Sequence, residues 1–466
     1  MEWVDVTMPH CNGNFSDKSD GGGLTGKRAT SQEIHRQSPS VVHTKNSTCA
    51  LQRTSSAFDD VRSGRRRKLV LHFDVRNTIL VSDSATRDNV EQALNSFLTG
   101  VTWGREEPTG WVWYSDRPSL RAPCSDVITY YKSRERELVR SPADRVKLRR
   151  ITGDFTQQPI GSKFRGYFEA HLRLLEWNVS PLMNGITSST LNTTVPTSVY
   201  DEPAKTKTEV ITVDEKLTTV GVDGRLYHYL LPSFIKMLFD LREDRYQFSV
   251  ILRTYGVDAP RVLDSIAHVA AGNHPQFPYK LPVDVNRQPG RIHRLPNNRI
   301  RCDVPSAENG LETLPPVVLE TDADIYRYMS AVDGICGFVD DFSYWQEHNY
   351  AHSKGKPLWI DIEDRDVQHI LFDDNIRVSD PDSIVDVRLF ERLCSSTAIS
   401  GRCRSLAVDE IAALENVFLV QADLLECTSD IDYFISRVRQ CEANYSDRLR
   451  QQDHCYETTD HATSAV

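Results

Sequence analysis

Three apolar segments of the sequence end in side chains that could bind or react with a phosphoryl group. Residues 69–73 lead to Asp74, residues 248–253 lead to Thr254, and residues 369–372 lead to the pair Asp373-Asp374. Such runs are typical of buried parallel strands, and the carboxyl ends of parallel strands meet at one edge of a sheet. Carboxylate oxygens from two strands suit Mg²⁺. The sequence therefore predicts a Mg²⁺ and phosphate site at that edge.

A phosphate site also needs positive charge, and two lysines precede the acidic pair. They are Lys354 and Lys356, in Ser353-Lys354-Gly355-Lys356-Pro357. A lysine near the acidic cluster would neutralise phosphoryl oxygens during transfer. The residues alone leave both lysines as candidates.

The elements that would position these residues follow from hydrophobic periodicity. Helical spacing is expected over residues 85–98, 164–175, 230–241, 323–350 and 431–443, and further strands over residues 358–361 and 417–420. Residues 179–218 are rich in Ser and Thr, and residues 281–316 in Pro and Asn, so both are expected to be irregular. Strands that alternate with helices predict an α/β fold with a mainly parallel, Rossmann-type sheet.

At these positions the chain resembles the haloacid dehalogenase-like (HAD) superfamily. The first motif of that family is a strand followed by Asp-x-Asp-x-Thr/Val, and here the segment reads Asp74-Val75-Arg76-Asn77-Thr78. Its second motif, a strand ending in Thr or Ser, is matched by Thr254. Its third and fourth, a lysine and then a strand ending in two acids, are matched by Lys356 and Asp373-Asp374. The resemblance covers about residues 68–380 and implies a HAD-like core with a large cap-type insertion.

The resemblance implies a role for each matched residue. Asp74 would be the nucleophile that forms an aspartyl-phosphate, and also a Mg²⁺ ligand. The backbone carbonyl of Arg76 and the Asp373 or Asp374 carboxylate would complete the protein ligands of the ion. Thr254 and Lys356 would bind the transferring phosphoryl group, and Arg76 and Thr78 are further candidates for substrate binding.

One residue departs from the family pattern. HAD phosphatases carry a general acid two residues after the nucleophile, and this chain has Arg76 there. A guanidinium does not lose its proton at ordinary pH, and general acid–base help is typically worth about 10²–10⁴-fold. The leading hypothesis is therefore a Mg²⁺-dependent phosphohydrolase or phosphotransferase with an unknown phosphorylated substrate, and the rival is a catalytically silent HAD-like scaffold. A carbon–halogen hydrolase is a third alternative, which the metal-binding acidic pair disfavours.

The expected organisation has four parts. Residues 1–66 lack apolar periodicity and predict a disordered tail, while residues 67–100 and 220–445 would form the core. Residues 101–219 would form the cap-type insertion, and residues 446–466 a flexible C-terminal tail.

Composition limits the classes of protein to which the chain could belong. Its 466 residues carry a net charge of −10, which disfavours a general nucleic-acid binder. No apolar run has the ~20 residues of a membrane span, and no signal peptide is evident at the start, so we expect a cytoplasmic protein without membrane or nucleic-acid partners. The basic run at residues 62–68 could instead be a nuclear-import signal, although a solvated charge cluster is the plainer interpretation.

Overall fold

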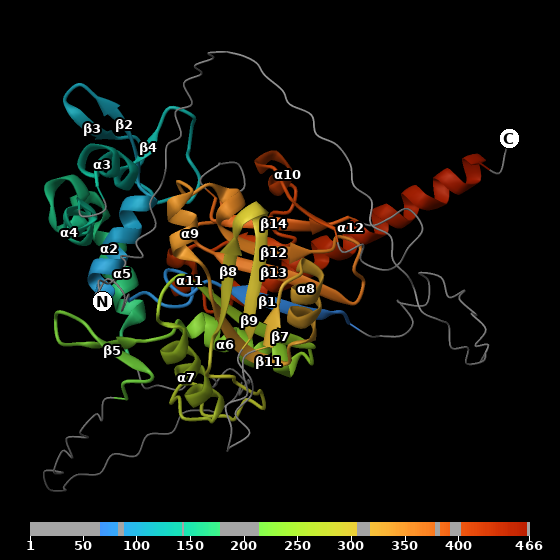
Figure 1. Cartoon of the computed structure of the whole chain (residues 1–466). Coiled ribbons are helices and arrows are strands. Elements are labelled where there is room, and N and C mark those ends of the chain that lie inside the picture. The colour runs from blue at the N-terminus through green and yellow to red at the C-terminus, as the bar shows by residue number, and fades with distance from the viewer. Residues whose placement is uncertain are drawn as a thin grey trace, which may run out of the picture. The chain divides into compact units, whose positions relative to one another are not determined.

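The computed structural model describes residues 66–82, 88–141, 144–177, 214–304, 317–377, 383–391 and 402–463. Its centre is an eight-stranded sheet in the order β10-β9-β8-β11-β7-β1-β13-β16 (Figure 1). The strands are β1 (Lys68–Phe73), β7 (Phe248–Thr254), β8 (Gly290–Leu295), β9 (Arg299–Val304), β10 (Val317–Leu319), β11 (Gly334–Val339), β13 (Val367–Asp373) and β16 (Leu419–Gln421). Neighbours from β8 to β16 run parallel, and β9 pairs antiparallel with β8 and β10. The predicted α/β fold with a mainly parallel sheet is confirmed.

The chain changes direction across the sheet at β1. After β1 it moves through β7 to β11 on one side, and it then returns to β13 and β16 on the other side. Strand β1 pairs with β13 from Lys68↔Val367 to Phe73↔Phe372, so Asp74 and Asp373 emerge together. A crevice at such a switch point is where open α/β sheets bind ligands.

The two faces of the sheet are covered by different elements. On β1, Leu71 packs in a cluster with Phe234 of α6 (Pro232–Glu243) and Phe434 of α12 (Tyr433–Thr463). The next side chain back, Val70, packs on the other face with residues of α8 (Asp322–Ala331) and with Trp359. This alternation of buried side chains follows from the two-residue period of a strand. The sheet is therefore apolar on both faces, as parallel sheets are.

Trp359 belongs to a second, three-stranded sheet, whose first strand precedes β13 in the sequence and whose other two strands lie between β13 and β16. Its strands are β12 (Lys356–Ile360), β14 (Val385–Phe390) and β15 (Cys403–Ser405), in that order. Helix α9 (Phe342–Glu347) and the 3₁₀ turn η5 (His352–Lys354) connect β11 to this sheet, and α10 (Val408–Ala412) connects it to β16. Helix α7 (Ala259–Ala270) and the 3₁₀ turn η4 (Pro296–Asn298) connect strands of the main sheet, and α11 (Leu424–Ser429) follows β16.

A long segment separates β1 from β7, in the place predicted for an insertion. It begins with α2 (Val90–Gly100) and a small sheet in the order β3-β2-β4, made of β2 (Trp103–Glu107), β3 (Gly110–Trp113) and β4 (Ile128–Thr129). Helices α3 (Tyr130–Leu138), α4 (Arg145–Gly153) and α5 (Arg165–Leu175) follow, with η2 (Phe155–Gln157) and η3 (Pro159–Phe164) between them. The hairpin β5 (Thr218–Val220) and β6 (Leu226–His228) ends the segment. Most of the predicted loop at residues 179–218 lies outside the described residues.

Two expectations from periodicity are wrong, and most of the predicted C-terminal tail belongs to a helix. Residues 281–316 contain the hairpin β8–β9, whose turn places Asn297 and Asn298 at positive φ, where Asn is tolerated. A single helix is expected over residues 323–350, but the structure has the helix α8, the strand β11 and the helix α9 there. The short apolar strand β11 separates the two helices. The predicted C-terminal tail continues α12 as helix to Thr463.

The end of the basic run is part of the folded structure. Arg66 stacks on Tyr246 and Arg67 on Tyr445, at 4.5 and 4.7 Å from the ring centroids. The Lys68 ammonium donates to the Val332 carbonyl at 2.5 Å. These contacts support a structural use of residues 66–68, while residues 62–65 and the predicted tail before them lie outside the described residues. In the part of the chain that the structure describes, no helix has both the length and the apolar character to cross a bilayer.

Candidate functional site

The chain turns sharply after β1, and the turn brings a second polar side chain to the strand end. The Ile79 and Leu80 amides both donate to the Val75 carbonyl at 3.0 Å, and Asn77 has a φ of 57°. Asn is among the few residues that adopt this left-handed conformation readily. The Asn77 side chain then donates to the Asp374 carboxylate at 3.4 Å. The turn therefore links the ends of β1 and β13.

Three carboxylates converge at this point. Oxygen atoms of Asp74, Asp373 and Asp374 all lie within 4.8 Å of one another. Asp373 is fully buried and Asp74 is 5% exposed. The Asn375 amide donates to Asp373 at 2.9 Å, and its side chain donates to Asp374 at 2.8 Å. Such a set of hard oxygen donors fits Mg²⁺.

Lys356 supplies the positive charge of the cluster. Its ammonium donates to Asp74 Oδ1 at 2.5 Å, to Asp373 Oδ2 at 2.7 Å and to the Arg253 carbonyl at 3.2 Å. The side chain is fully buried. The structure thus brings together Asp74, Lys356 and the Asp373-Asp374 pair.

Burial and mutual repulsion shift the acidities of these groups. Burial raises the pKa of Asp74 to about 7, against the lowering effect of Lys356, and Asp373 raises it further. Burial and the neighbouring Asp373 and Asp74 raise the pKa of Asp374 well above its usual range. Burial alone would lower the pKa of Lys356, but the Asp373 and Asp74 carboxylates outweigh it and raise that pKa. The lysine is therefore charged at neutral pH, while Asp74 and Asp374 retain protons more readily than free carboxyls.

The two predicted threonines lie at the end of β7 and in the turn after β1. Thr254 is the last residue of β7, and its hydroxyl oxygen accepts the Gly256 amide at 2.9 Å, which leaves the hydroxyl proton available. Thr78 is fully buried, and its hydroxyl has no hydrogen-bond partner among the described residues. The Thr254 hydroxyl can therefore donate to a ligand oxygen, whereas a binding role for Thr78 stays a prediction.

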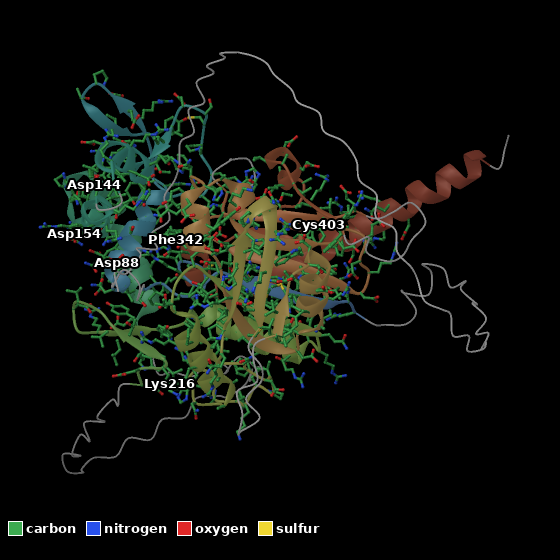
Figure 2. The ribbon with its side chains drawn as sticks, viewed as in Figure 1. Asp88, Asp144, Asp154, Lys216, Phe342 and Cys403 are labelled. Atoms are coloured by element: carbon green, nitrogen blue, oxygen red, sulfur yellow. The ribbon has the colours of Figure 1, made fainter. Side chains whose placement is uncertain are left out.

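Arg76 forms an ion pair with an acid that precedes α2. Its guanidinium lies 3.7 Å from the Asp88 carboxylate, which precedes α2. Asp88 lies on the side of the described structure that also carries Asp144 and Asp154 (Figure 2). Arg76 thus joins the turn after β1 to the start of the insertion. A metal-ligand role for its backbone carbonyl stays a prediction.

The two candidate lysines lie in different surroundings. Lys354, two residues before Lys356, lines a separate open cavity of about 710 Å³ with Arg294, Tyr344 and His348. Its position follows from η5, which ends at Lys354, whereas Lys356 begins β12. Gly355 permits this change, because a Cβ there would lie 1.9 Å from the Ile384 carbonyl oxygen.

Sequence reasoning missed a buried ion pair next to the site. Asp340 falls within the helix expected over residues 323–350, yet it directly follows the strand β11, is 4% exposed and binds Arg253 at 2.6 Å. Arg253 interrupts an apolar run with a charge, and this was the available signal that a buried partner had to exist. Asn77 and Asn375 gave no such signal, because their roles depend on turn geometry.

Removing the buried cation tests its place in the cluster. We expect Lys356→Met to lower the free energy of unfolding at pH 8 by about 3–5 kcal/mol, because buried carboxylates lose their counter-ion. At pH 5 the loss should be smaller, since the carboxyls with raised pKa values take up protons instead. Urea unfolding at both pH values measures this.

Lys354→Met is the matched control, because the same substitution two residues away removes a charge that does not contact the acids. It should change the free energy of unfolding by no more than about 0.5 kcal/mol at either pH. Equal effects of the two substitutions would contradict the assignment of Lys356.

Comparisons with known proteins identify no relative of this chain. No protein-family model matches the chain, and neither the curated proteins nor the solved structures that were searched contain a match. Any function must therefore be argued from the residues and their geometry.

Proposed function

We propose that the protein is a HAD-like, Mg²⁺-dependent phosphotransferase or phosphohydrolase that acts through Asp74 on a small phosphorylated substrate. The observation that carries the proposal is the contact of Lys356 with Asp74 and Asp373 at the switch point of the sheet. The inserted segment between β1 and β7 would form the cap over this site.

The residues present fit one divalent ion. Asp74, Asp373 and Asp374 carry three negative charges when ionised, and Lys356 offsets one of them. The two charges that remain match a single Mg²⁺, which these carboxylates would hold. A bound Mg²⁺ would supply positive charge that orients the phosphoryl oxygens and offsets their charge in the transition state.

Side chains of the protein would carry out the nucleophilic attack and bind the phosphoryl group. Lys356 binds Oδ1 of Asp74, so Oδ2 is the oxygen proposed to attack phosphorus. A bond from this oxygen to phosphorus forms as the bond to the leaving group breaks, and the leaving group departs with the bonding electrons. The hydroxyls of Thr254 and Thr78 would donate to the transferring phosphoryl oxygens. Water or an acceptor hydroxyl would then attack phosphorus, the bond from phosphorus to Asp74 would break to restore the carboxylate, and the proton of the attacking group would pass to a phosphate oxygen of the product or to solvent.

Arg76 narrows the substrates that such a site can use. Its guanidinium cannot give a proton to a leaving group, and it is held at 3.7 Å from Asp88. Leaving groups that depart as stable anions, such as the carboxylate of an acyl phosphate, need no proton. We therefore expect acyl and aryl phosphates to react faster than alkyl phosphates. Rates of phosphate release across these three classes, with and without Mg²⁺, test the proposal.

Mg²⁺ should stabilise the protein more at high pH than at low pH. The pKa of Asp74 is raised to about 7, so without metal the stability due to its protonated form is complete below about pH 4. That stability is lost as the pH rises through about 7, where the carboxylate becomes buried and charged. Mg²⁺ binds the ionised form and offsets the loss.

Thermal unfolding with and without saturating Mg²⁺ at pH 5.5 and pH 8 measures this effect. The increase in Tm caused by Mg²⁺ should be larger at pH 8, and it should vanish in a variant with Asp74→Asn and Asp374→Asn together. An increase that is the same at both pH values would contradict a Mg²⁺ site made of these acids.

A silent scaffold remains the second candidate, and one observation favours it. The Arg76–Asp88 ion pair uses the position of the expected general acid to hold the inserted segment. A scaffold of this kind would bind Mg²⁺ and phosphate without turnover. Mg²⁺ binding together with absent phosphate release from every substrate class would identify it.

A further inference from the structure

Arg253 is a charged residue inside a buried strand at the centre of the sheet. It is the sixth residue of β7, which lies between β1 and β11, and its side chain is fully buried. Its partner Asp340 follows β11 directly and has a side chain that is 1% exposed. A buried ion pair is often no more stabilising than an apolar pair of the same volume. The position of this pair therefore calls for a reason other than stability.

The contacts of Arg253 converge on the beginning of β12. The guanidinium binds Asp340 through two bonds, with Nε donating at 2.9 Å and Nη2 at 2.6 Å. The same Nη2 donates to the Pro357 carbonyl at 3.0 Å. The backbone carbonyl of Arg253 accepts the Lys356 ammonium at 3.2 Å. One residue thus contacts the lysine and the residue that follows it.

This connection matters because Lys356 does not belong to the main sheet. It begins β12, which pairs with β14 in the second sheet, whereas Asp74 and Asp373 follow strands of the main sheet. The ladder that aligns Asp74 with Asp373 therefore does not fix the lysine. A bond from β7 to Pro357 aligns the two sheets beside the ammonium. The Asp340 amide donates to the Thr254 carbonyl at 2.8 Å, which holds the other half of the ion pair against β7.

We propose that the Arg253–Asp340 pair is a positioning device that sets the distance of Lys356 from Asp74 and Asp373. This inference rests on the proposed function for its effect on turnover, but the structural coupling is independent of it. Without the pair, the ammonium keeps its charge and loses its fixed place between the two carboxylates. Turnover then falls, while competition between the ammonium and a metal ion for the carboxylates weakens.

The variant that tests this replaces both charges at once, with Arg253→Met and Asp340→Leu. Removing one partner alone would leave an uncompensated buried charge and could unfold the protein. The matched control is Arg145→Met with Glu135→Leu, which removes another largely buried ion pair, 3.1 Å long, between α4 and α3. Each pair is removed with Lys356 present and with Lys356→Met.

The first measurement is urea unfolding without metal, so that it depends on neither substrate nor ion. The effects of removing the Arg253–Asp340 pair and of Lys356→Met should be non-additive, because the pair acts through the lysine. The control pair should give additive effects. If the changes in the free energy of unfolding caused by removing the Arg253–Asp340 pair and by Lys356→Met are additive, the proposal is overturned.

The second measurement compares Mg²⁺ affinity by calorimetry with turnover of acetyl phosphate. With Lys356 present, loss of the pair should lower kcat about 10–100-fold, as expected of a small misplacement at a reacting centre, while Mg²⁺ binds several-fold more tightly. With Lys356→Met, neither value should change further. A structural role alone would weaken both binding and turnover, and that result would overturn the positioning role. No Asp74-dependent turnover in the unaltered protein would instead contradict the proposed function, and the unfolding cycle would still decide the coupling.

Discussion

Asp74→Asn should lower Mg²⁺-dependent phosphate release from acyl and aryl phosphates by about 10⁴-fold or more, because an amide replaces the nucleophile. The substitution keeps the size of the side chain. It also removes a carboxylate that is 5% exposed and whose pKa is raised to about 7, so the fold should persist. Single-turnover release of phosphate measures the effect.

Asp361→Asn is the matched control for this loss. Asp361 directly follows β12 and is 4% exposed, so the same substitution is made at another buried strand end, outside the three acids. Its phosphate release should stay within about threefold of that of the unaltered protein, as expected when no interaction specific to the transition state is lost. Equal activity of the two variants would show that release does not depend on Asp74.

Arg76→Asp should produce the second large effect, in the opposite direction. A carboxyl group two residues after Asp74 could donate a proton to an alkoxide leaving group, and such help is typically worth about 10²–10⁴-fold. We therefore expect hydrolysis of alkyl phosphates to rise by that factor, with a much smaller gain for acyl phosphates. Steady-state kcat/KM values for one alkyl and one acyl phosphate measure the difference.

Arg76→Ala separates the new carboxyl group from the lost cation. It removes the Arg76–Asp88 contact, as Arg76→Asp does, but it supplies no acid. Alkyl phosphate hydrolysis should therefore stay low in Arg76→Ala. A similar rise in both variants would mean that Arg76 only obstructs the site, and no rise in either would place residue 76 away from the leaving group.

The strand ends that form the site were predictable because they depend on local patterns. A buried parallel strand needs a continuous apolar run, so the segments before Asp74, Thr254 and Asp373 indicated both their structure and their common edge. Their order in the sheet was not predicted, because it depends on which strands pair.

The position of Lys356 and the strands outside this pattern were harder to predict. Lys356 begins a strand of the second sheet, and its place depends on contacts with Arg253 that are more than 100 residues away in sequence. The β8–β9 hairpin was hidden by its Pro and Asn content, because those residues form the turn rather than interrupt the strands. Hydrophobic periodicity depends only on residues that are close in sequence. It therefore cannot predict contacts between residues that are far apart in sequence.

The most direct test of a nucleophilic Asp74 is to look for the covalent intermediate. The protein would be incubated with Mg²⁺ and acetyl phosphate, quenched in acid, digested and analysed by mass spectrometry. We expect one phosphoryl group on the peptide that contains Asp74, released by hydroxylamine as an acyl phosphate should be, and absent in Asp74→Asn. Phosphate release with a label on another residue, or release that persists in Asp74→Asn without any label, would contradict the account.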